Sequence, residues 1–222
     1  MESVTRDLKG ARPRIAGLGY GVATDEDFER TPLHPEESGL MEGMRPGRRR
    51  EFWMGRAAAH RALSELGTVD GPVLSVDRRP IFPSGFVGSL SHSCGAAVAI
   101  AAPKARFAAL GIDIELNPMP AAAAHLVLAP EECELARRGE YSCAEAFSAK
   151  EAGFKALSAL PVSGPLVLRL LALDRITGGF KVRLPLRRDI PAYVFTRSLG
   201  KGWLAWTAIR ATIWNGNARA SR

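Results

Sequence analysis

Two acidic residues separated by one apolar residue, Asp113 and Glu115, are the first candidates for chemistry in this chain. They stand in the run GIDIEL at 111–116, where acidic and large apolar residues alternate. On a β-strand both carboxylates would project from one face, while the isoleucines enter the core. Two negative charges held so close repel each other unless a cation or a basic side chain lies between them. The run therefore fits a metal site, although a solvated strand face would give the same pattern.

A second group of polar residues lies in FSAKEAGFKA at 147–156. On a helix, Phe147, Glu151 and Lys155 fall on one stripe at steps of four. The alternative is a surface Glu–Lys pair, which contributes only roughly 0.2–0.5 kcal/mol. Because the stripe also holds Phe147, the pattern indicates a face buried against another element. Carboxylates in such a place suit Mg²⁺, which takes oxygen ligands and is often completed by substrate phosphates.

Small residues, hydroxyls and glycines gather in GSLSHSCG at 88–95. Backbone N–H groups of such a segment can approach an anion closely, and Ser91 and His92 can add side-chain hydrogen bonds. We interpret the segment as a phosphate cradle, although a lone histidine is more often structural.

Five arginines add guanidinium groups suited to bidentate phosphate contacts. They are Arg48, Arg49, Arg56, Arg78 and Arg79. Taken singly, each of them is more typical of a solvated surface.

Two amphipathic helices are predicted to position these groups, over 48–66 and over 144–160, because apolar residues recur there at steps of three and four. Each ends at a residue that stops helices, a glycine after the first and a proline after the second. In the first helix His60 falls on the apolar stripe, and Arg56 is expected on the polar face.

Strands are predicted between and after the helices from short β-prone runs. They are 72–76, 98–101, 107–116, 166–173, 180–184, 192–196 and 203–211. Residues 31–47 and 78–85 are expected to be loops, because proline and glycine interrupt them. Each half thus offers a substantial helix and several strands, with connections too variable for a regular βαβ series, so the expected class is α+β.

The expected organisation is an N-terminal half over 1–104, a C-terminal half over 105–214 and a flexible tail over 215–222. Three cysteines without a Cys-x-x-Cys pair fit neither a disulfide framework nor a zinc knuckle, which favours a reducing cytoplasm. No export signal is visible at the start, and no apolar run approaches the roughly 20 residues that cross a bilayer. A net charge of +7 favours an acidic or phosphorylated partner.

Together these motifs resemble the 4′-phosphopantetheinyl transferase family, in the branch of enterobactin synthetase component D. Four motifs carry the resemblance in the family's order, over about half of the chain. They are RRREFWMGR at 48–56, the stretch 80–92 ending in GSLSH, GIDIE at 111–115, and FSAKEA at 147–152 with Lys155. The chain departs from many relatives outside the branch at Phe147, where they have tryptophan.

The resemblance implies two similar α/β halves arranged as an intramolecular pseudo-dimer, with coenzyme A in the cleft between them. It implies that Asp113, Glu115 and Glu151 bind Mg²⁺ together with the coenzyme's pyrophosphate. Contacts to the coenzyme's phosphates would come from Arg48, Arg56, Ser91, His92 and Lys155. For the 3′-phosphate both Arg78 and Arg79 are candidates, and Arg79 is favoured.

The implied reaction moves 4′-phosphopantetheine from coenzyme A to a serine of an apo peptidyl, aryl or acyl carrier protein and releases 3′,5′-bisphosphoadenosine. Glu151 is then either a general base toward the serine or only a metal ligand, and the sequence leaves both roles open. Lys155 would stabilise or protonate the leaving phosphate. Siderophore or other secondary-metabolite synthesis, such as nonribosomal peptide synthesis, is the expected service, and a monomer is expected.

Two other classes of function compete with this interpretation. A nucleic-acid-binding domain would explain the net charge and the arginine run 48–50, but no basic stripe interleaved with aromatic residues is present. A Mg²⁺-dependent phosphoesterase would use the same three carboxylates to activate water. We therefore expect neither a nucleic-acid nor a membrane partner.

Overall fold

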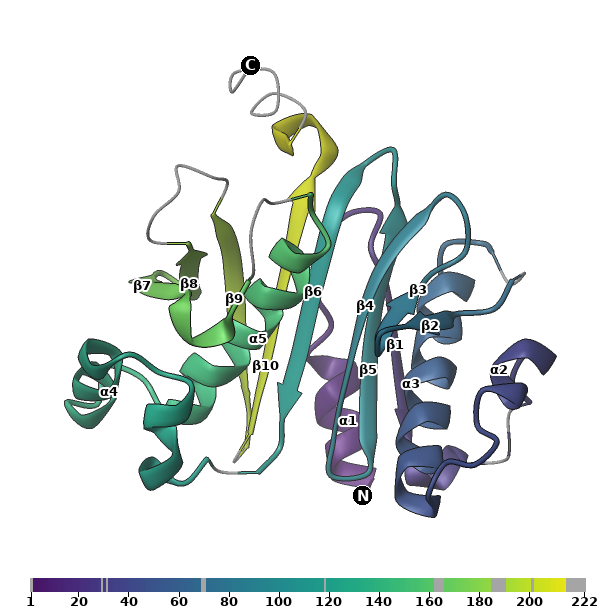
Figure 1. Ribbon diagram of the computed structural model, residues 1–222, viewed down its shortest axis with the longest axis horizontal. Coiled ribbons are helices and arrows are strands. Elements are labelled where there is room, and N and C mark those ends of the chain that lie inside the picture. Colours follow the sequence, from purple (N-terminus) through teal and green to yellow (C-terminus); the bar gives the residue numbers. More distant parts are fainter. Residues whose placement is uncertain are drawn as a thin grey trace. The chain divides into compact units, whose positions relative to one another are not determined.

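The computed structural model describes residues 2–28, 30, 32–68, 71–117, 119–161, 166–184, 191–200 and 202–214. The chain divides into two compact units, residues 1–106 and 107–222. Each unit packs a long helix on an antiparallel sheet (Figure 1), which confirms the predicted α+β class with two similar halves. The predicted tail, 215–222, lies outside the described residues. No helix in the described ranges is long and apolar enough to cross a membrane.

The N-terminal unit has a three-stranded sheet in the order β1-β5-β4 and a separate two-stranded hairpin, β2-β3. Its elements are α1 (Glu2–Gly10), β1 (Gly19–Thr24), the 3₁₀ turn η1 (Asp25–Asp27), α2 (Pro35–Gly39), α3 (Pro46–Ser64), β2 (Leu74–Val76), β3 (Arg79–Ile81), β4 (Phe86–Ser93) and β5 (Ala96–Pro103). Helix α3 packs on β1 and β5. Alanines of the helix and of β5 form much of the core, together with Phe52 and Trp53. Small side chains at this contact allow the helix to lie close to the sheet.

The C-terminal unit has a five-stranded antiparallel sheet in the order β6-β10-β9-β8-β7, with α5 packed on it. Its elements are β6 (Phe107–Glu115), η2 (Ala121–Leu126), α4 (Pro130–Arg137), α5 (Cys143–Ser158), η3 (Leu168–Leu170), β7 (Ala172–Ile176), β8 (Gly179–Arg183), β9 (Ala192–Leu199) and β10 (Gly202–Arg210). Helix α5 begins after Ser142, whose hydroxyl accepts a hydrogen bond from the Glu145 amide at 3.0 Å. That N-cap satisfies one of the amide groups that a helix start leaves without a partner.

The two predicted helices are confirmed, but parts of the strand and loop predictions are wrong. The predicted strand over 166–173 is instead a 3₁₀ turn followed by β7, because pairing with β8 starts only at Ala172. The predicted loop over 31–47 contains α2 and the start of α3, and the loop over 78–85 contains β3. The presumed phosphate cradle lies mostly in β4, whose backbone bonds go to β5.

In both units a glycine of the sheet lies directly against the backbone of the long helix. A methyl group built on Gly21 of β1 would overlap the carbonyl oxygen of Ala58 in α3. One built on Gly111 of β6 would overlap the carbonyl oxygen of Ala152 in α5. Each helix therefore touches its strand through backbone atoms, and this shared packing is a structural repeat that the sequence does not display as a repeat.

Replacing Gly111 with alanine will lower the free energy of unfolding by about 1–3 kcal/mol or more, because the colliding atom belongs to the helix backbone and cannot rotate away. Urea unfolding followed by circular dichroism measures this change. Gly10→Ala is the matched control, since nothing lies within 4 Å of the methyl group that it adds. Equal stabilities of the two variants would contradict the packing described here.

Candidate active site

Asp113 is buried near the end of β6, with an exposed fraction of 6%. Its neighbours Ile112 and Ile114 are buried as well, as the alternating pattern predicted. A buried carboxylate is costly unless polar groups surround it. Here Lys155 Nζ donates to Asp113 Oδ1 at 2.8 Å, and Ser148 Oγ donates to Oδ2 at 2.9 Å. Both donors come from α5, so the helix and the strand are joined through this carboxylate.

One face of α5 carries Ser148, Glu151 and Lys155, which are spaced by three and four residues. Two of these residues bond Asp113, and Lys155 Nζ also donates to the carbonyl oxygen of Ile112 at 3.1 Å. Glu151 lies between them on the same face. The structure thus brings Asp113 together with Glu151 and Lys155, which share one helix face as their spacing predicted.

Burial raises the pKa of Glu151 above its usual range. The ammonium of Lys155 lowers this pKa and the carboxylate of Asp113 raises it, and the raising effects prevail. Within the part of the chain that the structure describes, no hydrogen bond to Glu151 compensates its burial. The negative charge of Glu151 lies near that of Asp113 and is only partly compensated by Lys155, so a cation or a proton would stabilise it.

Glu115 ends β6 two residues after Asp113 and therefore belongs to the same face of the strand. It is half-buried, and its Oε1 accepts a hydrogen bond from the Asn117 amide at 2.9 Å. The strand thus presents two of the three predicted metal ligands on the side that α5 covers.

Among the described residues, no group of three His, Cys, Asp or Glu side chains is arranged to hold a metal ion. The oxygens of Asp113 are engaged by Lys155 and Ser148, and Glu115 is engaged by a backbone amide. The composition of the site nevertheless fits a hard divalent cation, since it offers carboxylate oxygens and an excess of negative charge at Glu151. The metal assignment of the three carboxylates stays a prediction.

In the N-terminal unit the structure brings Arg48 of α3 and His92 of β4 together. Arg48 Nη1 lies 3.4 Å from His92 Nε2 and donates to Glu51 Oε2 at 3.2 Å. All three side chains are between 32% and 48% exposed. Since an arginine can only donate, His92 Nε2 is the group that could accept in this contact, and Glu51 Oε2 lies 3.9 Å from the same nitrogen. An anion that displaced Glu51 would meet a guanidinium and an imidazole from two different elements.

The helix pattern predicted that Arg56 lies on a polar face, and this prediction is wrong. Arg56 is buried, with an exposed fraction of 4%. Its Nη2 donates to the carbonyl oxygen of Leu74 at 3.0 Å, and its guanidinium lies 4.2 Å from the centre of the Phe52 ring. Burial lowers the pKa of Arg56 to about 10; the charge of Glu37 opposes this lowering, and the charge of Arg48 adds to it. Its predicted contact with coenzyme A remains untested.

The remaining candidates lie on β3 and β4. Arg79 is exposed at the start of β3, directly after the turn formed by Asp77 and Arg78, both of which have positive φ. Ser91 is buried within β4, with an exposed fraction of 7%. The turn places the two candidate arginines next to each other at the end of the hairpin, and which of them meets a phosphate stays a prediction.

Sequence reasoning missed Ser148, which bonds the buried carboxylate of Asp113. The residue stands inside the motif that named Glu151, three positions before it. Helical spacing alone could have placed it on the same face.

Two family profiles match this chain. Residues 36–102 match the 4′-phosphopantetheinyl transferase N-terminal domain, and residues 109–205 match the 4′-phosphopantetheinyl transferase superfamily. The first range includes α3 and β4 with Arg48 and His92, and the second includes β6 and α5 with the carboxylates.

Individual relatives are similar to this chain as well, and two of the three named below carry the same description. The 4′-phosphopantetheinyl transferase Svp from Streptomyces mobaraensis is 36% identical over 170 residues, which cover 66% of this chain and 69% of Svp. The 4′-phosphopantetheinyl transferase PptT from Mycobacterium tuberculosis is 36% identical over 99 residues, 44% of this chain and 43% of PptT. Enterobactin synthase component D from Escherichia coli O157:H7 is 32% identical over 135 residues, 58% of this chain and 64% of that protein.

Proposed function

This chain belongs to the 4′-phosphopantetheinyl transferase family, and we propose that it transfers the phosphopantetheine arm of coenzyme A to a carrier-protein serine with the residues of β6 and α5 as its catalytic centre. The observation that carries this assignment is the desolvated carboxyl group of Glu151 beside the joined pair of Asp113 and Lys155. Such a group is unfavourable in a merely structural role.

In this proposal Asp113, Glu115 and Glu151 hold a Mg²⁺ ion. When bound, the ion would neutralise phosphate charge and favour attack on phosphorus. Arg48, Arg79 and His92 would bind phosphate groups of coenzyme A, since their guanidinium and imidazole groups suit phosphate oxygens. Glu151 and Lys155 of α5 would then take part in the transfer step itself.

The proposed step breaks the bond between the β-phosphorus and the oxygen of the leaving group, and forms a bond from that phosphorus to the serine oxygen. The serine proton passes to the carboxylate of Glu151, whose raised pKa makes it a better base. The ammonium of Lys155 stabilises the phosphate of the departing 3′,5′-bisphosphoadenosine. The protein thus acts chiefly by positioning reactants and balancing charge, as phosphoryl transfer requires.

The carrier substrates in this proposal are apo peptidyl, aryl or acyl carrier proteins of siderophore or other secondary-metabolite synthesis. This choice is supported by the similarity to enterobactin synthase component D. A cytoplasmic monomer with Mg²⁺ remains the expected form of the enzyme.

Intact-mass spectrometry of apo carrier proteins, after incubation with this protein, coenzyme A and Mg²⁺, tests the proposal. A mass increase of one phosphopantetheine on at least one carrier is expected. A panel of peptidyl, aryl and acyl carriers ranks the substrate classes by kcat/KM. Unmodified carriers throughout the panel would refute the proposed reaction.

A further inference from the structure

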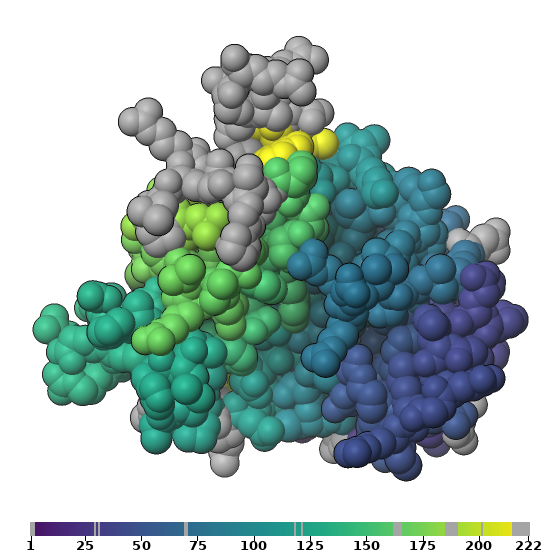
Figure 2. Space-filling model, in the orientation of Figure 1, coloured from purple at the N-terminus to yellow at the C-terminus, as the bar shows by residue number. Residues whose placement is uncertain are grey.

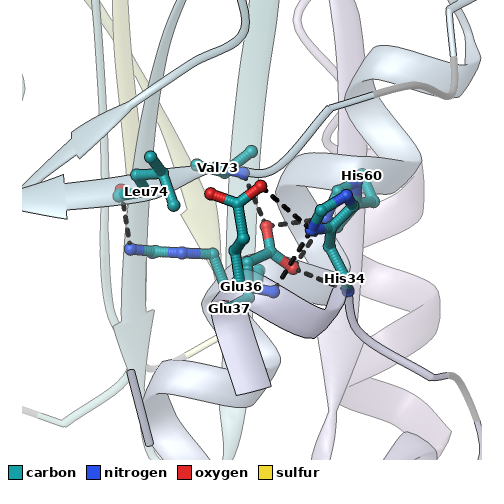
Figure 3. A network of polar contacts seen from close by, with 7 residues as sticks. His34, Glu36, Glu37, His60, Val73 and Leu74 are labelled. Atoms are coloured by element: carbon teal, nitrogen blue, oxygen red, sulfur yellow. Dashed lines mark hydrogen bonds and ion pairs between the residues drawn. The ribbon is translucent and has the colours of Figure 1, made fainter. Parts of the chain in front are cut away.

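A buried acidic residue of the N-terminal unit has no part in the contacts discussed above. Glu37 has an exposed fraction of 0%, although it belongs to the five-residue helix α2, whose segment forms part of the molecular surface (indigo in Figure 2). His60 of α3 donates through Nε2 to its two oxygens at 2.8 and 2.9 Å (Figure 3). The amides of Val73 and His34 donate at 2.6 and 3.2 Å.

These contacts keep Glu37 ionised. Burial alone would raise the pKa of its carboxyl, but the hydrogen bonds from His60 and Val73 outweigh burial and lower this pKa below its usual range. His60 and the amides of Val73 and His34 thus compensate the charge of the Glu37 carboxylate inside the unit. Through Val73 the carboxylate holds the start of the β2-β3 hairpin in place.

Val73 directly precedes β2, and the next residue is held as well. Arg56, four residues before His60 on α3, donates to the carbonyl oxygen of Leu74 at 3.0 Å. Two side chains on one face of α3 thus fix two successive residues at the root of the β2-β3 hairpin, with Glu37 as the link for Val73.

The second strand of the hairpin is fixed at the same root by an aromatic contact. A methyl group built on Gly88 of β4 would overlap the ring of Phe82, which follows β3 and is buried. Both strands of the hairpin are therefore anchored at the root to other elements of the unit. The opposite end of the hairpin is the turn of Asp77 and Arg78, and Arg79 stands next to that turn, paired with Val76.

We propose that Glu37, linked to α3 through His60, is a positioning residue for coenzyme A: it fixes the root of the β2-β3 hairpin so that Arg79 is presented to the 3′-phosphate. This inference rests on the proposed phosphate contact of Arg79. Glu37 itself is buried and touches no part of the coenzyme; it acts through the strand that it holds.

The test compares coenzyme A with 3′-dephospho-coenzyme A as donors, because the two differ only in the group that Arg79 is proposed to bind. The wild type is expected to prefer coenzyme A by about tenfold to hundredfold in kcat/KM, the range of a charge-assisted contact. Arg79→Ala and Glu37→Gln should each remove most of this preference through KM for coenzyme A, with kcat little changed. The double variant should lose no more than either single one.

Glu36→Gln is the matched control, because Glu36 stands on the same short helix with its side chain 61% exposed. Its preference should equal that of the wild type. Should Glu37→Gln fail to fold, His60→Ala serves instead, since it removes one link and leaves the amide hydrogen bonds to Glu37 in place. Circular dichroism confirms the fold of each variant before kinetics.

The possible outcomes separate the role of Glu37, the phosphate contact of Arg79 and the proposed function. Equal losses with both donors in Glu37→Gln and His60→Ala would overturn the inference, since a purely structural defect cannot distinguish the donors. A full preference in Arg79→Ala would overturn the phosphate contact and the inference with it, while transfer itself would stand. Absence of transfer by the wild type would instead refute the proposed function.

Discussion

Replacing Glu151 with glutamine will reduce kcat for phosphopantetheine transfer by about a hundredfold or more and will make the protein more stable in metal-free buffer at neutral pH. The loss of rate follows from removing a carboxylate that is proposed as base or metal ligand, where general-base effects alone reach about 10²–10⁴-fold. The gain in stability follows from removing a half-buried charge beside Asp113.

The gain in stability has a defined dependence on pH. The folded protein raises the pKa of Glu151 above its ordinary value of 4.5, so the folded state keeps this proton to a higher pH than the unfolded state. The wild type therefore loses stability as pH rises from 4.5 to the raised pKa, whereas glutamine does not titrate. The difference in Tm between variant and wild type should grow over this window and then stay constant.

Scanning calorimetry in EDTA across this pH range measures the stability, and intact-mass time courses at saturating Mg²⁺ measure the rate. Glu140→Gln is the matched control, since Glu140 is an exposed acid that precedes the same helix. It should change neither quantity. Full activity of Glu151→Gln would reject its catalytic assignment, and a lower Tm at neutral pH would show that the carboxylate is compensated within the fold.

The two long helices could be predicted because their apolar residues repeat at steps of three and four, and the strands β8, β9 and β10 because β-prone runs are bounded by turns. β1 and β4 were missed because glycine, alanine and serine fill them, so they show little contrast between faces. Their identity as strands depends on pairing with β5, which is a non-local contact.

In the candidate site, too, local patterns were predictable from the sequence and contacts with distant residues were not. Local spacing predicted that Glu151 and Lys155 share a helix face, and the family resemblance placed Asp113 with them; the structure shows all three close together. Arg56 was misplaced because its partner is the carbonyl of Leu74, 18 residues away. Glu37 was missed because its segment has no periodicity, and its partners His60 and Val73 lie 23 and 36 residues further along. Burial of a charge depends on such distant partners, and no single segment encodes it.

Lys150 presents the clearest contrast with its neighbour Glu151. Its side chain is 0% exposed, and its Nζ lies 2.6 Å from Glu132 Oε2 of α4 and donates to the carbonyl oxygen of Val127 at 3.0 Å. Glu132 in turn accepts hydrogen bonds from the amides of Ala129 and Leu173 at 2.8 and 3.0 Å. This ion pair thus joins α5 to α4, to the segment before α4, and to β7.

Replacing Lys150 with methionine will lower the free energy of unfolding by about 3–5 kcal/mol, because it leaves the carboxylate of Glu132 buried without its countercharge. Adding Glu132→Gln will recover part of this loss, since the double variant buries no net charge. Protein that remains folded should transfer phosphopantetheine at a rate within a few-fold of the wild type, because Lys150 points away from the Asp113 site and toward Glu132.

Urea unfolding of the two single variants and the double variant gives the coupling energy of the pair. Glu134→Gln is the matched control on α4, where an exposed carboxylate pairs with Arg137 and Arg138, and it should change stability little. An unchanged stability of Lys150→Met would contradict the buried pair. A stable variant without activity would instead move Lys150 from a structural to a catalytic role. Adjacent residues of one motif would then serve one reaction, whereas the proposal gives Glu151 a role in chemistry and the contacts of Lys150 give it a role in the fold.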